Sequence, residues 1–98
     1  MATIHELQTM AHEIAKAHGW RGHKRNDGEL IALMRSELSE ALEALRVPDM
    51  PHVGEELADT VIRIMDFCEA RGIDLEEQII RKMAINNKRP HRHGGKAF

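Results

Sequence analysis

Hydrophobic residues recur every three or four positions along most of the chain, a period that predicts helices rather than strands. The first such stretch is typical, since Ile4, Leu7, Met10, Ala11 and Ile14 fall on one face of a helix. No stretch alternates in the way that a half-buried strand would. Four helices are therefore predicted, over about residues 4–17, 28–46, 51–71 and 75–87.

The ends of these helices carry ordinary start and stop signals. Thr3 followed three residues later by Glu6 predicts a capping box before the first helix, and Asp27 is a candidate N-cap for the second. Pro48 and the nearby Pro51 break the chain between the second and third helices. Gly72 stands where the third helix is expected to stop. Short connections of this kind join antiparallel neighbours, so the predicted fold is an all-α, four-helix, antiparallel bundle-like protomer.

The third predicted helix is apolar around most of its circumference. A helix of this kind is normally buried on several sides, and four short helices can hardly cover one another so completely. We therefore predict a homo-oligomer in which this helix packs against its symmetry mate. The residues concerned are Val61, Ile62, Ile64, Met65, Phe67 and Cys68.

Length and composition predict a single soluble domain over residues 1–98. No apolar run approaches the roughly 20 residues that a membrane span needs, and the first residues lack the features of a signal peptide. Cys68 is the only cysteine, so no internal disulfide can form. These features predict a cytoplasmic protein with no membrane partner.

Charge is unevenly distributed, although the formal net charge is only −2. So small a net charge argues against a general nucleic-acid binder. Twelve of the sixteen acids lie in residues 37–77, whereas residues 81–98 hold six Lys or Arg and no acid. This division fits a metal site beside an anion site, and it equally fits a flexible basic tail, over about residues 90–98, on an ordinary bundle.

Two pairs of acids flank the break between the second and third helices. Glu37 and Glu40 precede it, Glu56 and Asp59 follow it, and the members of each pair are three residues apart. Residues at this spacing are neighbours on a helix. Glu40 and Glu56 are each about eight residues from the break, and Glu37 and Asp59 are each about eleven. At a rise of about 1.5 Å per residue, the two pairs therefore lie at the same distance along their helices from the break. We therefore expect four carboxylates to face one another across the two helices.

Four adjoining carboxylates need a cation, because their mutual repulsion and partial burial are costly. Oxygen ligands favour Mg²⁺ over Zn²⁺, with Mn²⁺ as a substitute. The alternative is an ordinary ion pair, for which Arg63 lies four residues after Asp59.

Three stretches resemble the MazG-like nucleotide pyrophosphohydrolases of the all-α NTP pyrophosphatase superfamily. They are SELSEALEALR, GEELADTVIRIMDF and KMAINNKRPHRHGGKAF, and the resemblance spans roughly residues 17–98. It implies an intertwined homo-oligomer, a homodimer or homotetramer. It also implies hydrolysis of a nucleoside triphosphate to the monophosphate and pyrophosphate with Mg²⁺, in house-cleaning or control of the nucleotide pool.

The resemblance also implies roles for individual residues. The metal ligands would be Glu37, Glu40, Glu56 and Asp59. Further along, the stretch K-x-x-x-N-x-x-R resembles the one beside the phosphates, and HGGK resembles the ending of small members. These stretches correspond to Lys82, Asn86, Arg89 and Lys96.

Some roles stay open at this stage. Either Glu37 or Glu40 could act as general base towards water. Trp20 could stack on a nucleobase or cover the end of the first helix. The enzymatic alternative is a phosphoribosyl-ATP pyrophosphohydrolase-like activity, and the alternative of another class is a non-catalytic helical module that dimerises or binds partners.

Overall fold

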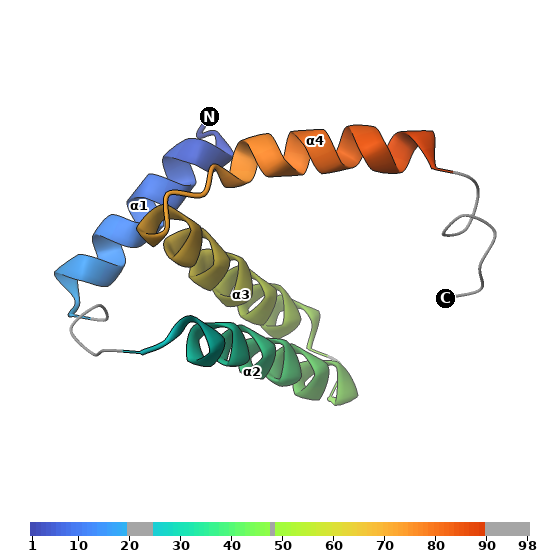
Figure 1. Cartoon of the computed structure of the whole chain (residues 1–98). Coiled ribbons are helices and arrows are strands. Elements are labelled where there is room, and N and C mark those ends of the chain that lie inside the picture. Colours follow the sequence, from blue (N-terminus) through green and yellow to red (C-terminus); the bar gives the residue numbers. More distant parts are fainter. Residues whose placement is uncertain (20–24, 48, 90–98) are drawn as a thin grey trace.

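The structure, a computed structural model, describes residues 1–19, 25–47 and 49–89. These ranges contain four α-helices and no strand (Figure 1). The predicted all-α class is therefore confirmed, and every predicted helix boundary lies within one residue of the observed one. The helices are α1 (Ile4–Ala17), α2 (Asp27–Arg46), α3 (Met50–Ala70) and α4 (Leu75–Lys88).

Local hydrogen bonds explain where the helices begin and end. The predicted capping box is present: Thr3 Oγ1 accepts from the Glu6 N–H at 3.1 Å, and the Glu6 side chain accepts from the Thr3 N–H at 3.2 Å. The predicted N-cap of α2 was wrong. Asn26, not Asp27, is the N-cap, and its side chain accepts a hydrogen bond from the Glu29 N–H at 2.8 Å. Gly72 has a φ of 69°, a left-handed conformation that glycine adopts without a steric penalty.

Helices α2 and α3 form an antiparallel hairpin, and α1 packs across α3 (Figure 1). Small side chains dominate the contacts, which lets the helix axes approach closely. The buried apolar residues are Ala11, Ala15, Ala41, Ala44, Val53, Met65 and Cys68. The core therefore lies between three helices, and the predicted burial of Cys68 is confirmed.

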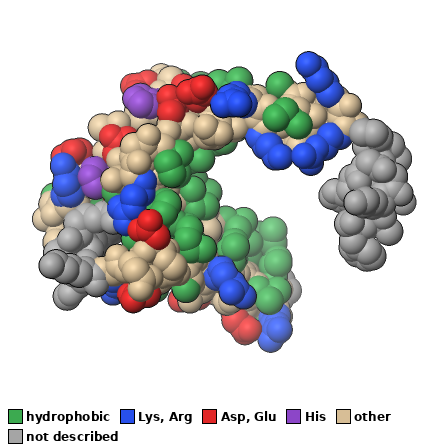
Figure 2. Space-filling view, viewed as in Figure 1, with side chains coloured by type: hydrophobic (Ala, Val, Ile, Leu, Met, Phe, Trp, Pro, Cys, Tyr) green, Lys and Arg blue, Asp and Glu red, His purple; other side chains and the backbone are tan. Residues whose placement is uncertain are grey.

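Helix α4 packs against α1 and extends away from the α2–α3 hairpin (Figure 1). None of its residues is buried, and Ile80 and Met83 are 63% and 65% exposed. Figure 2 shows hydrophobic side chains gathered on the part of the surface that faces the hollow below α4. The four helices thus leave a large apolar surface open instead of closing around one core.

Within the described ranges, no helix is both long and apolar enough to cross a membrane.

Candidate metal and substrate site

Three of the four predicted metal ligands come together in the structure. Glu37 on α2 and Glu56 and Asp59 on α3 each offer a carboxylate oxygen, and these oxygens lie within 4.8 Å of one another. Hard divalent cations hold oxygen ligands at about 2.0–2.6 Å, so oxygens at this separation could bind one ion after small side-chain rotations. The antiparallel hairpin produces this proximity, as the counting of residues from the break predicts.

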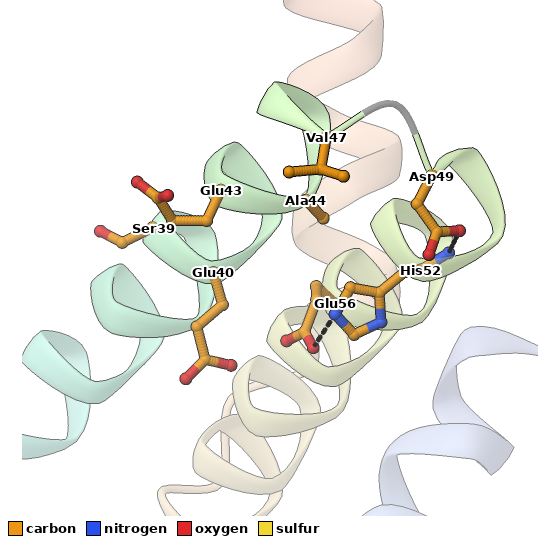
Figure 3. Close-up of a pocket in the computed structure, with 8 residues that line it drawn as sticks. All are labelled: Ser39, Glu40, Glu43, Ala44, Val47, Asp49, His52 and Glu56. Carbon is orange, nitrogen blue, oxygen red and sulfur yellow. Dashed lines mark hydrogen bonds and ion pairs between the residues drawn. The ribbon is translucent and has the colours of Figure 1, made fainter.

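The fourth acid, Glu40, lies beside Glu56 rather than within the group of three. Both side chains line a pocket of about 540 Å³ between α2 and α3 (Figure 3). Glu40 raises the pKa of Glu56 above its ordinary value, first by sharing a hydrogen bond with it, and partial burial and the charge of Glu40 add to the rise. Two carboxyl groups can share a hydrogen bond only when one of them holds a proton.

The environment of Glu56 is the least satisfied in the site. Its side chain is 12% exposed, and its Oε2 atom is buried without a hydrogen-bond partner in the described structure. A buried carboxylate oxygen of this kind is costly unless a donor, a proton or a cation compensates it. A divalent cation would remove the deficit, and the neighbouring oxygens of Glu37 and Asp59 fit that requirement.

A guanidinium and an imidazole also contact the acidic group. Arg63 Nε lies 2.9 Å from Glu37 Oε1, so the pairing of Arg63 with Asp59 that its spacing allows is not the contact formed. His52 Nε2 lies 3.4 Å from Glu56 Oε1. Neither contact involves the Oε2 atom of Glu56.

A groove of about 770 Å³ begins at the acidic group and runs between α1 and α3. Glu37, Asp59 and Arg63 line it, and apolar side chains form most of its wall, including Met10 and Ile62. Gly19 and Arg25, which stand on either side of residues 20–24, also line it. The groove therefore joins a polar, acidic end to an apolar channel, an arrangement that suits a ligand with a charged part and a flat apolar part.

The predicted phosphate-binding residues are separate from the acids. Lys82 and Asn86 lie on α4, and Arg89 follows as its C-cap. No residue of α4 lines the groove or the pocket, or belongs to the group of three carboxylates. Trp20 and Lys96, predicted to contact the substrate, lie outside the described residues, as does the predicted tail over residues 90–98.

Several polar contacts near the site were not predicted. His52 is four residues before Glu56, a spacing from which its contact could have been read. Asp66 Oδ1 lies 2.9 Å from His12 Nδ1. This partner comes from α1, 54 residues away in the sequence, and no local spacing indicates it.

Comparisons of this chain with protein-family models, with curated proteins and with solved structures gave no match.

Proposed function

We propose that the protein is a Mg²⁺-dependent nucleoside triphosphate pyrophosphohydrolase that cleaves a (d)NTP to the (d)NMP and pyrophosphate. The buried Oε2 atom of Glu56, which has no hydrogen-bond partner and belongs to a group with the carboxylates of Glu37 and Asp59, is the observation that carries the proposal. The sequence resemblance to the MazG-like enzymes supports the same reaction. House-cleaning or control of the nucleotide pool is the corresponding role.

Glu37, Glu56 and Asp59 would hold the cation, with Glu40 beside them. Mg²⁺, or Mn²⁺ in its place, would supply charge neutralisation on the phosphates and a more acidic bound water. Glu40 is favoured over Glu37 as the base that takes the proton of the attacking water, because Glu37 is already bound to Arg63. The apolar groove would take the nucleoside, and Trp20 belongs to the segment that joins two residues of its wall.

Self-association is part of the proposal. Described residues of α2 and α3 leave large apolar side chains about half exposed, and a second copy would cover them. They include Ile31, Leu38, Leu42 and Leu45 on α2 and Leu57, Val61 and Ile62 on α3. A homodimer or a homotetramer would satisfy this requirement.

A nucleotide panel tests the proposal directly. Pure protein is incubated with each common or oxidised (d)NTP and with phosphoribosyl-ATP, in Mg²⁺ or in EDTA, and the products are separated by chromatography. We expect a nucleoside monophosphate and pyrophosphate in Mg²⁺ and none in EDTA. The absence of these products from every nucleotide would contradict the proposed reaction.

Substitutions of the acids connect activity to the site. Glu40→Gln and Asp59→Asn should each lower kcat by about 100-fold or more, the range expected for loss of a general base or of charge stabilisation. Glu13→Gln is the matched control, because Glu13 is an exposed acid on α1 that pairs with Lys16 at 3.0 Å and lines neither the pocket nor the groove. Wild-type turnover in both Glu40→Gln and Asp59→Asn would remove these residues from the mechanism.

The same exposed apolar faces support a second candidate, a non-catalytic helical module that binds partners through them. This candidate predicts an oligomer without hydrolysis of any nucleotide. It also predicts that Asp59→Asn leaves partner binding unaffected, because Asp59 belongs to the acidic group and is not one of the exposed apolar residues.

A further inference from the structure

We propose that Asp66, at the far end of the groove, selects nucleotides whose base carries an amino group at C4 of a pyrimidine or C6 of a purine. These bases are cytosine and adenine. The inference rests on the proposed function, because it names the base that the same groove would accept. Asp66 is outside the group of three carboxylates, so it is assigned a role that the metal ligands and the general base do not fill.

The position of Asp66 along α3 matches the place of a base. Asp59 and Asp66 both project from α3 and line the same groove. Seven residues separate them, so they lie on one face of the helix about 10.5 Å apart along its axis. Asp59 belongs to the acidic group, where the phosphates would bind. The sugar and the base ring span a comparable length, which places the polar edge of the base, and not the sugar, beside Asp66.

The wall of the groove suits a flat ring that has one polar edge. Met10 and Ile14 of α1 and Ile62 and Met65 of α3 line it with apolar side chains. The side chain of Asp66 is only 20% exposed. A polar group that is buried in such a wall without a hydrogen-bond partner is costly. The edge of a base that reaches Asp66 must therefore match the hydrogen bonding of a carboxylate.

His12 on α1 holds the Asp66 carboxylate in place. Its Nδ1 atom lies 2.9 Å from Asp66 Oδ1, and the imidazole is itself only 18% exposed. A carboxylate accepts hydrogen bonds and does not donate them, so the contact assigns a proton to Nδ1. An ionised carboxylate offers about four acceptor positions on its two oxygens. Asp66 can therefore keep its bond to His12 and accept another from a base in the groove.

An acceptor at this position discriminates between bases by their chemistry. Cytosine and adenine present an N–H donor at C4 and C6, whereas thymine and guanine present a carbonyl oxygen there, as do uracil and hypoxanthine. A carbonyl would place two acceptors opposite each other and leave both without a donor. Hydrogen bonds to charged groups are strong enough for a preference of about 10- to 100-fold.

Other polar side chains in the groove favour different partners. Arg63 lies at the acidic end, where its Nε atom is 2.9 Å from Glu37 Oε1. Arg25 also lines the groove, and a guanidinium only donates hydrogen bonds. Recognition of the base by Arg25 would consequently select a carbonyl, the opposite of what Asp66 selects. The two assignments therefore predict opposite orders of substrates.

Matched pairs of nucleotides test the assignment. The kcat/KM of the wild type is measured in Mg²⁺ for dCTP against dUTP and for dATP against dITP, since each pair differs in the amino group. We expect the amino base to be preferred by about 10- to 100-fold in both pairs. Equal values in both pairs would overturn the proposal, and a preference for dUTP and dITP would assign the base to Arg25 instead.

Asp66→Asn connects the preference to the side chain. The amide has the same shape and presents a donor as well as an acceptor, so the preference for dCTP over dUTP should fall at least about tenfold through loss of dCTP turnover. Partial unfolding would lower both substrates equally and leave their ratio unchanged. Glu13→Gln, on an exposed acid outside the groove, is the control. An unchanged ratio in Asp66→Asn, or a change confined to CTP against dCTP, would overturn the assignment to the base.

His12 is a positioning residue in this proposal. His12→Ala should weaken the preference for dCTP, mainly through a higher KM. His12→Asn should restore much of it, because its amide N–H can take the place of the Nδ1 donor. Far-UV circular dichroism on each variant checks the fold. A preference that is the same in His12→Ala and the wild type would remove His12 from the selection of the base.

The two proposals fail in different ways. Binding of the α,β-imido analogues of dCTP and dUTP, measured by calorimetry, tests base selection without hydrolysis. A protein that hydrolyses no nucleotide contradicts the proposed function, and equal or absent binding of the two analogues then removes base selection as well. An active protein that treats both members of each pair alike overturns only the role of Asp66.

Discussion

At the scale of single residues, Glu56 determines the electrostatics of the candidate site. Its partially buried carboxyl group has the acids Glu40 and Asp59 as neighbours, and the His52 imidazole lies 3.4 Å from its Oε1 atom. Folding without a cation therefore brings like charges together, a cost that surface acids elsewhere in the chain avoid. We therefore expect the neighbouring acids around Glu56 to lower the stability of the metal-free protein.

The raised pKa of Glu56 gives the sign of the pH dependence. A carboxyl group whose pKa rises on folding binds its proton more tightly in the folded state. The stabilisation it contributes is fully present below its ordinary pKa of 4.5 and is lost as the pH rises through the raised value in the folded protein. As the pH rises from this range in the absence of metal, the raised pKa of Glu56 makes the folded state less stable.

Replacing Glu56 with Gln should therefore raise the Tm of the metal-free protein at pH 7 by a few degrees, because the amide removes a charge and can donate to Glu40. The same variant should lose the increase in Tm that Mg²⁺ gives the wild type. Differential scanning fluorimetry with and without Mg²⁺ measures both effects. Glu55→Gln is the control, since Glu55 is an adjacent, 77% exposed acid outside the group of three. A lower Tm for Glu56→Gln would indicate a structural ion pair instead.

At the scale of elements, the attachment of α4 depends on one buried polar side chain. Gln8 on α1 is 2% exposed, and its Nε2 atom donates to Glu69 Oε1 at 3.0 Å and to the Ile73 carbonyl at 2.7 Å. Its Oε1 atom accepts from the Leu75 N–H at the first turn of α4. The Gln8 amide thus satisfies two backbone groups, the Ile73 carbonyl before α4 and the Leu75 N–H at its start.

Gln8→Leu, a substitution of similar volume, should lower the free energy of unfolding by about 1–3 kcal/mol, because the carbonyl of Ile73 and the N–H of Leu75 lose their buried partner. Urea denaturation followed by circular dichroism measures the change. Thr9→Ala is the control, since Thr9 is exposed and its substitution should stay within about 0.5 kcal/mol. Equal stability of Gln8→Leu and the wild type would show that water satisfies both groups.

The elements differ in how far the sequence predicts them. Helix ends follow local signals such as the Thr3–Glu6 box, and the meeting of Glu37 with Asp59 follows from counting along an antiparallel hairpin. The direction of α4 could not be predicted, because it depends on Gln8 contacts that span 61 to 67 residues. For the same reason the sequence did not indicate that Lys82, on α4, would lie apart from the acids of its own chain.

At the scale of the whole molecule, three helices form a small core and the fourth stands apart from it. Among the residues that the structure describes, seven apolar ones are buried and four of these are alanines, which leaves little hydrophobic stabilisation for a monomer. The proposed association would add the missing burial. Stability and assembly should therefore be linked.

The Tm of the wild-type protein should rise with protein concentration, because association stabilises only the folded chain. Leu42→Asp should abolish this rise, since Leu42 is 52% exposed on the apolar face of α2. Ser36→Asp places the same charge on the opposite side of α2, so this variant should retain the rise in Tm with protein concentration. Calorimetry over a hundredfold range of concentration makes the comparison, and a constant wild-type Tm would show that the monomer is self-sufficient.

The separation of α4 from the three packed helices also has a consequence for biogenesis. During translation, α1, α2 and α3 leave the ribosome first and can pack while α4 is still being made. Under the proposed self-association, the exposed apolar side chains of these helices are covered only by another finished chain. Formation of the oligomer would then be second-order in the concentration of the chain. It would be slow when little mRNA is present and fast when neighbouring ribosomes on one mRNA release chains close together.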